Sequence, residues 1–157
     1  CVGKDIGAVG FVGVAGVTAT PQLELLGISS GSDVLLRVDT ATGAGSIIGA
    51  LGVDFGNQGA AWNEMESRIY ALNANTDDVY GVDATTGAAS LITSLDRDFG
   101  SVGFEYHPLN QRTYGCSSDA ILYEIDTSTG MTSGIGPIPQ PDGCSNLAAP
   151  WIPVSCL

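Results

Sequence analysis

The sequence contains a turn motif, Asp-x-x-Thr-Gly, that recurs three times at nearly constant spacing. The three copies run from Asp39 to Gly43, from Asp83 to Gly87 and from Asp126 to Gly130. In each copy the aspartate side chain can cap the turn, and the glycine can adopt the left-handed conformation that a short hairpin loop requires. A self-similar period of about 44 residues indicates a chain built from repeated supersecondary units.

Strand-like segments surround each copy of the motif in the same order. Apolar stretches precede the turn (residues 34–38, 79–82 and 121–125), and further stretches lie before them (25–28, 69–72 and 113–116) and after the turn (46–48, 90–92 and 133–135). A first strand follows Asp54-Phe55-Gly56 and Asp98-Phe99-Gly100, and Asp5-Ile6-Gly7 with Gly10-Phe11-Val12 fits the same template. Short apolar segments separated by turn residues predict an all-β fold with four antiparallel strands per unit.

A four-stranded unit of this length has the size of one blade of a β-propeller. The stretch from Leu122 to Gly136 resembles secreted bacterial β-propeller repeats of the type LYxIDxxTGxxxxIG. The resemblance implies blade-like sheets, and it specifies no activity, because such blades occur in enzymes, lectins and scaffolds. We predict a single domain over residues 1–157, with repeats at about 5–53, 54–97 and 98–141, and an extra C-terminal strand or docking tail at 142–157.

Three blades do not obviously close a ring, since closed propellers typically carry about 4 to 8. An open arc leaves apolar faces and sheet edges exposed, which favours association. We therefore expect a secreted structural or interaction protein whose partners are copies of itself, joined through terminal strands as a filament or as a dimer that closes one ring. A fragment or a compact three-sheet prism are the alternatives. The residues expected to dock are Leu147, Pro150, Trp151, Ile152, Pro153 and Val154.

Four cysteines without a Cys-x-x-Cys pair favour two disulfides over a zinc site. Cys116 and Cys144 belong to neighbouring units, so we expect them to pair, which leaves Cys1 and Cys156 to join the chain ends within one chain or between two. Disulfides predict an extracellular or cell-surface location. An N-terminal cysteine that carries a bacterial lipid anchor is an alternative use of Cys1.

The composition excludes some classes of function. A net charge of −12 with five scattered basic residues argues against nucleic acid, whose binding needs clustered cations. No apolar run reaches the roughly 18 residues of a membrane span. His107, the single histidine, stands in a hairpin corner with no marked nucleophile, so we expect a turn residue and no catalysis.

Two ligand hypotheses remain beside self-association. Carbohydrate or another ligand would bind at repeated exposed aromatic and acidic clusters, although the repeated tyrosines, such as Tyr70 and Tyr114, suit packing between sheets better. Calcium would use the densest acidic cluster, Asp77 and Asp78, since this ion takes oxygen ligands; we otherwise expect no cofactor. A propeller hydrolase is the weakest hypothesis.

Overall fold

The computed structural model describes residues 3–100, 102–139 and 143–149. Twelve strands in these ranges form three antiparallel sheets of four strands, each in sequence order. The first sheet contains β1 (Val14–Ala19), β2 (Leu25–Ser29), β3 (Val34–Val38) and β4 (Gly45–Ala50). The second contains β5 (Gln58–Asn63), β6 (Arg68–Asn73), β7 (Asp78–Val82) and β8 (Ala89–Ser94). The third contains β9 (Gly103–His107), β10 (Arg112–Cys116), β11 (Ile121–Ile125) and β12 (Thr132–Pro137).

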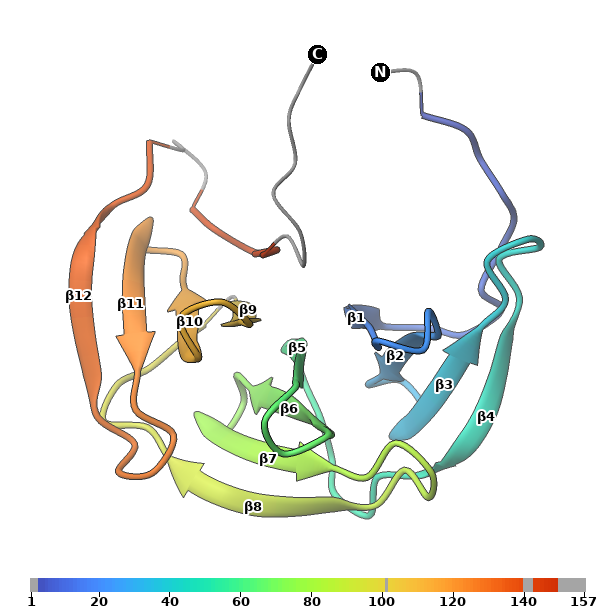
Figure 1. Cartoon of the computed structure of the whole chain (residues 1–157), viewed down its shortest axis with the longest axis horizontal. Coiled ribbons are helices and arrows are strands. Elements are labelled where there is room, and N and C mark those ends of the chain that lie inside the picture. Colours follow the sequence, from blue (N-terminus) through green and yellow to red (C-terminus); the bar gives the residue numbers. More distant parts are fainter. Residues whose placement is uncertain (1–2, 101, 140–142, 150–157) are drawn as a thin grey trace.

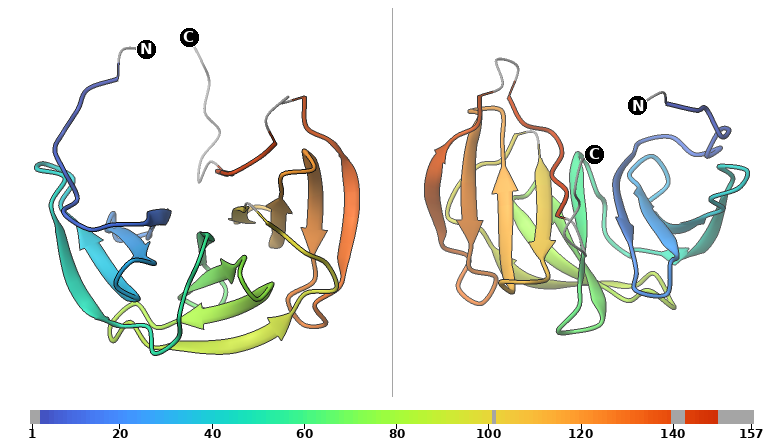
Figure 2. Two further views of the ribbon diagram at one scale, coloured as in Figure 1. Left: turned by 180° about the vertical axis from the view of Figure 1, so that it is seen from behind. Right: turned by 45° about the horizontal axis from the view of Figure 1, so that its top comes forward.

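The three sheets stand side by side around a common centre and form an open arc (Figure 1). The first strands β1, β5 and β9 line the centre, where β5 contacts both of the others, and β4, β8 and β12 form the rim. Residues 3–13 and residues 143–149 lie on the two sides of the opening (Figure 2). The predicted all-β fold of three four-stranded antiparallel repeats is confirmed, and each sheet falls within one predicted repeat range. The described residues include no helix that could cross a membrane.

The repeated turn motif closes the hairpin between the third and fourth strands of each sheet. In the second sheet, Asp83 Oδ1 accepts hydrogen bonds from the backbone N–H groups of Thr85 and Thr86, at 2.7 and 3.0 Å. Gly87 donates its N–H to the Asp83 carbonyl at 2.8 Å and has a φ of 79°, a conformation that costs glycine little. The equivalent glycines of the other two sheets have φ values of 77° and 78°, so one local rule builds all three hairpins.

Two hydrophobic clusters hold adjacent sheets together. The cluster between the first and second sheets contains Phe55, and the cluster between the second and third contains Phe99; both rings are almost fully buried. An aspartate from the preceding sheet fixes each phenylalanine: Asp33 Oδ1 accepts the N–H of Phe55, and Asp77 Oδ1 accepts that of Phe99, both at 2.9 Å. The Asp-Phe-Gly segments therefore join one sheet to the next.

The first repeat begins in a different register from the one suggested by Asp5-Ile6-Gly7. The Gly13 carbonyl accepts the N–H of Ser30 at 3.1 Å, and in the second repeat the Asn57 carbonyl accepts the N–H of Ala74 at 2.8 Å. Gly13 and Asn57 are therefore equivalent, and they are 44 positions apart. The same spacing places Phe11, and not Ile6, at the position of Phe55. Phe11 is only half-buried, since the described residues contain no sheet before the first that could cover it.

Candidate functional site

The face of the third sheet that borders the opening includes an apolar part that lacks the cover that its counterparts have. Ile48, Ile92 and Ile135 each stand five residues after the glycine of their turn. Ile48 and Ile92 pack against the clusters between sheets, whereas Ile135 is 55% exposed. Likewise Val79 is fully buried, while its equivalent Leu122 is half-buried. These side chains would be covered only by a further sheet.

Residues 143–149 follow the path that the first strand of a fourth sheet would take. Adjacent first strands approach closely at a glycine: a Cβ on Gly16 would lie 2.9 Å from the Ala60 Cβ, and one on Gly59 would lie 2.5 Å from the Phe104 Cβ. At the equivalent Gly103, a Cβ would lie 2.7 Å from the carbonyl carbon of Asn146. The segment therefore lies against β9 much as β9 lies against β5.

A disulfide between Cys116 and Cys144 fixes the start of this segment, and the predicted pairing is confirmed, with a Cα–Cα distance of 5.5 Å. The Cys144 N–H also donates to the Ser117 carbonyl at 3.0 Å. The bond indicates an oxidising environment such as the outside of the cell. Cys1 and Cys156, which we expected to form the second pair, lie outside the described residues.

A groove of about 410 Å³ separates residues 147–149 from the outer part of the sheet. Its walls and floor are formed by Glu105, His107, Tyr114, Leu122, Ile135, Leu147, Ala148 and Ala149. Leu147 thus lies at the surface where docking was expected. The other residues expected to dock, Pro150, Trp151, Ile152, Pro153 and Val154, lie outside the described residues.

Glu105 is the charged group buried in this groove. It pairs with Tyr114 across the ladder, as Thr18 pairs with Leu26 and Ala61 with Tyr70, so these three residues are equivalent. Burial raises the pKa of the Glu105 carboxyl to about 7, against the opposing effect of hydrogen bonds from the N–H groups of Ala149 and Tyr106. The Tyr106 bond is 3.0 Å long. A carboxylate here therefore lacks much of the solvation that its charge needs.

The first sheet shows what this position does. Thr18 Oγ1 accepts the N–H of Trp62, a residue of the next first strand, at 2.8 Å. The Ala149 N–H likewise lies near enough to the Glu105 carboxyl to lower its pKa. The side chain at this position thus faces the following first strand, and in the third repeat it brings a negative charge that Thr18 does not have.

His107 is the last residue of β9, and its carbonyl accepts the N–H of Gln111 at 2.9 Å, so it stands at the corner of the β9–β10 hairpin while its side chain lines the groove. Its ring meets that of Tyr114 edge to face, with centroids 6.4 Å apart. Its Nδ1 is buried without a hydrogen-bond partner among the described residues. Sequence reasoning missed both Glu105 and His107 as groove residues; the available signal was a charged residue at a position where the second repeat has Ala61.

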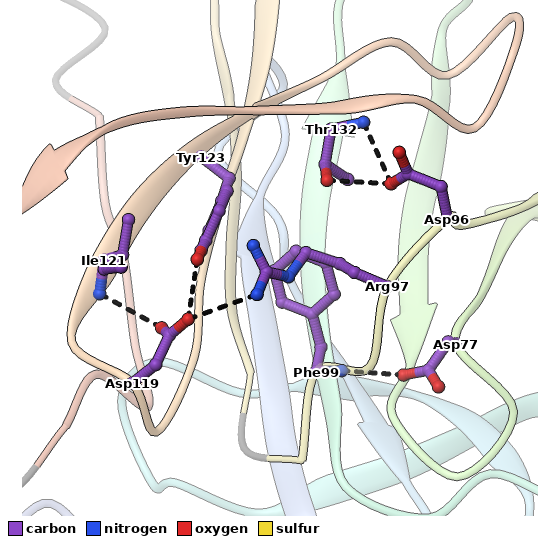
Figure 3. A network of polar contacts seen from close by, with 8 residues as sticks. All are labelled: Asp77, Asp96, Arg97, Phe99, Asp119, Ile121, Tyr123 and Thr132. Carbon is purple, nitrogen blue, oxygen red and sulfur yellow. Dashed lines mark hydrogen bonds and ion pairs between the residues drawn. The ribbon is translucent and has the colours of Figure 1, made fainter.

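A second polar cluster joins the second and third sheets (Figure 3). The Arg97 guanidinium carbon lies 3.9 Å from the centroid of the Tyr123 ring, and its Nη2 lies 3.4 Å from Asp119 Oδ2. The same carboxylate oxygen accepts the Tyr123 hydroxyl at 2.6 Å, which holds the pKa of Asp119 below its ordinary value. Because these groups satisfy one another, this cluster suits a structural link between sheets.

The two aspartates considered for calcium are engaged within the protein. Asp77 caps Phe99, and Asp78 accepts hydrogen bonds from the hydroxyls of Ser94 and Tyr80. The described residues contain no group of three or more His, Cys, Asp and Glu side chains that could hold a metal ion. Tyr70, Trp62 and Tyr106 are each less than 8% exposed, so these rings pack between sheets and offer no stacking surface for a sugar.

Radially arranged, four-stranded antiparallel sheets with their first strands at the centre define a β-propeller-like protein. No family model matches the sequence, and no curated protein matches it. Among solved structures, it is similar to a protein of unknown function from Bacteroides thetaiotaomicron, with a TM-score of 0.67 and 20% identity over 80% of this chain and 33% of that chain.

Two further structures have the same kind of likeness. One is a catalytically inactive virginiamycin B lyase from Staphylococcus aureus with quinupristin, with a TM-score of 0.57 and 12% identity over 82% of this chain and 42% of that one. The other is in a nidogen–laminin complex, with a TM-score of 0.60 and 11% identity over 79% and 48%. The chain spans a third to a half of these proteins, and the likeness establishes the fold alone.

Proposed function

We propose that this chain is a secreted, non-catalytic interaction module that binds a partner protein by accepting a β-strand at an incomplete fourth sheet. The observation that carries the proposal is the placement of residues 143–149. Strands β1, β5 and β9 each pair with a second strand, β2, β6 and β10, whereas residues 143–149 have no ladder partner among the described residues. Strand addition uses unpaired backbone groups beside an apolar groove, and residues 143–149 lie beside such a groove.

The groove supports protein binding better than catalysis. Apart from Glu105, His107 and Tyr114, its lining is aliphatic, which suits the apolar side of an added strand. Among the structural neighbours, one stands in a complex of nidogen with laminin, so propeller-like proteins do serve as partners of other proteins. The disulfide near the groove fits a module that works outside the cell.

A second copy of the chain is one source of the added strand, as the sequence predicts for a self-assembling protein. Docking of the terminal strands of two copies would cover Ile135 and Leu122 at once. Whether copies associate as a dimer or as a filament follows from the rotation between them, because a head-to-tail contact closes only at suitable angles.

The test places a photoreactive p-benzoylphenylalanine at Ile135 in cells that produce the protein. We expect irradiation to give a discrete protein adduct at this site, and mass spectrometry to identify the attached peptide. Leu91 provides the matched control, since it is also an exposed outer-strand residue, 58% against 55% for Ile135, and lies on β8 of the second sheet. Equal adduct yields at Ile135 and Leu91 would contradict the proposal.

A further inference from the structure

We infer that the strand accepted at the fourth sheet carries a basic side chain that reaches Glu105, so that the partner is a cationic, amphipathic β-strand of another protein. This inference rests on the proposed function and names its partner class. The inference depends on two neighbouring features. The half-buried carboxylate of Glu105 lies at the floor of an otherwise largely apolar groove. Residues 143–149, beside this groove, have no ladder partner among the described residues.

The carboxylate has unused capacity for a charged partner. The Tyr106 N–H donates a hydrogen bond to Glu105, and the Ala149 N–H lies near it, while a carboxylate offers about four acceptor positions. No ion pair joins Glu105 to a base in the part of the chain that the structure describes. A Lys or Arg arriving with an added strand would supply the missing counter-charge in a site already sheltered from water, where a charge-assisted hydrogen bond is strong.

A second copy of this chain is a poor source of the cation, because its arginines already face acids of their own chain. Each arginine forms an ion pair within the chain: Arg37 with Glu24, Arg68 with Glu66, Arg97 with Asp119 and Arg112 with Glu124. Among the lysines and arginines of the described ranges, Lys4 alone stands outside an ion pair. The net charge of −12 also repels a second copy and attracts a basic partner.

The strand must also match the apolar wall of the groove. Leu122 and Ile135 stand on neighbouring strands β11 and β12, so an added strand would meet them with every second side chain. Because Glu105 lines the same groove as Leu122 and Ile135, the basic side chain must belong to the same alternate series as the apolar ones. A strand with valines at alternate positions, one of them replaced by lysine, and threonines between them is the simplest probe with this chemistry.

The experiment measures the binding of two capped octapeptides to the full chain by isothermal titration calorimetry at pH 7.5: Thr-Val-Thr-Lys-Thr-Val-Thr-Val, the lysine peptide, and Thr-Val-Thr-Glu-Thr-Val-Thr-Val, the glutamate peptide. We expect the lysine peptide to bind wild type at least about tenfold more tightly than the glutamate peptide. Glu105→Gln should reduce this preference to about threefold or less, and Leu122→Glu should abolish binding of both peptides. Circular dichroism verifies that each variant is folded.

Glu64→Gln is the matched control, because it removes one carboxylate from an exposed loop residue outside the groove. It should keep the wild-type preference, which separates Glu105 from the general acidity of the surface. A preference that survives Glu105→Gln overturns the inference. Equal binding of the two peptides to wild type also overturns it, but leaves strand acceptance standing. If neither peptide binds wild type, the inference and the proposed function fail together.

Discussion

At the scale of single residues, equivalent positions in the three repeats carry different chemistry on the same backbone. In the first repeat Glu24 forms an ion pair with Arg37. In the third repeat Arg112 stands in place of Glu24 and Glu124 in place of Arg37, so the two charges are exchanged. In the second sheet Gly81 stands at the position of Arg37 and Glu124. The Arg68 side chain fills the space beside this glycine and forms an ion pair with Glu66. These exposed pairs contribute little stability, so charge can vary there freely, whereas Glu105 places a charge where the fold is sensitive to it.

The first prediction concerns the pH dependence that Glu105 imposes. Its pKa rises from an ordinary 4.5 to about 7 in the fold, so the folded state keeps a proton that the unfolded state loses. The stabilisation is complete below pH 4.5 and is lost as pH rises to about 7. We expect the free energy of unfolding of Glu105→Gln, relative to that of wild type, to increase by about 1 to 3 kcal/mol from pH 4.5 to pH 8. Urea unfolding measures both.

The groups on this face of the sheet are His107, Tyr114, Arg112 and Glu124, from β9, β10 and β11. Glu64→Gln retains all of them and serves as the control. A Glu105→Gln curve parallel to that of wild type would show that the carboxyl is not held in its neutral form.

The second prediction concerns Gly103, where two backbones meet. A Cβ there would lie 2.6 Å from Cys116 Sγ and 2.7 Å from the Asn146 carbonyl carbon, and neither is the free end of a flexible side chain. We expect Gly103→Ala to displace residues 143–149 and to cost about 1 to 3 kcal/mol. Gly100→Ala is the control, since the nearest atom to its new Cβ lies 4.0 Å away. Thermal unfolding compares the two, and equal melting temperatures would contradict close packing at Gly103.

At the scale of elements, the link between one sheet and the next changes character at the end of the array. Phe55 and Phe99 anchor the first two links by burial. Gly143 occupies the corresponding position of the third link, 44 residues after Phe99, and the adjacent Cys144 is tied to Cys116. A covalent bond thus takes the place of aromatic packing at this link, where the described residues form no fourth sheet.

The third prediction follows from this replacement. The double variant Cys116→Ser with Cys144→Ser should release residues 143–149 and lower the free energy of unfolding by about 2 to 4 kcal/mol. Hydrogen–deuterium exchange should show a loss of protection in this segment and in β9, with the first sheet unchanged. Uniform loss across all three sheets would contradict a local role for the disulfide.

The sequence predicted the elements more completely than the site. The Asp-x-x-Thr-Gly turns specify hairpins through local hydrogen bonds, so the repeat alone was enough to place four strands around each. The register of the first repeat was missed because Asp5 imitates Asp54 in sequence, while the position is defined by the long-range bond from Ser30 to Gly13. The groove was missed for a similar reason. Whether Glu105 and His107 are covered depends on whether another sheet packs against the third one, and the local sequence around these residues does not show this.

At the scale of the whole molecule, the sheets form a short array in which only the middle one has a neighbour on each side. All six residues of β5 are buried, whereas β1 alternates between exposed and partly buried positions and has one buried residue. Stability in such arrays is close to a sum of unit and nearest-neighbour interface terms. The second sheet is therefore stabilised by interfaces with two neighbouring sheets, whereas the first and third sheets are each stabilised by one.

The fourth prediction is a gradient of local stability along the arc. Amides of β5 and β6 should exchange only by global unfolding, while those of β1 and β12 should exchange through openings of lower free energy. Addition of the lysine peptide should then slow exchange in β9 and residues 143–149 and leave β1 unchanged, because a bound strand covers part of the exposed face of the third sheet. Equal protection of β1, β5 and β12 in the free protein would mean that the open arc unfolds as one cooperative unit and that its open face carries no local instability for a partner to relieve.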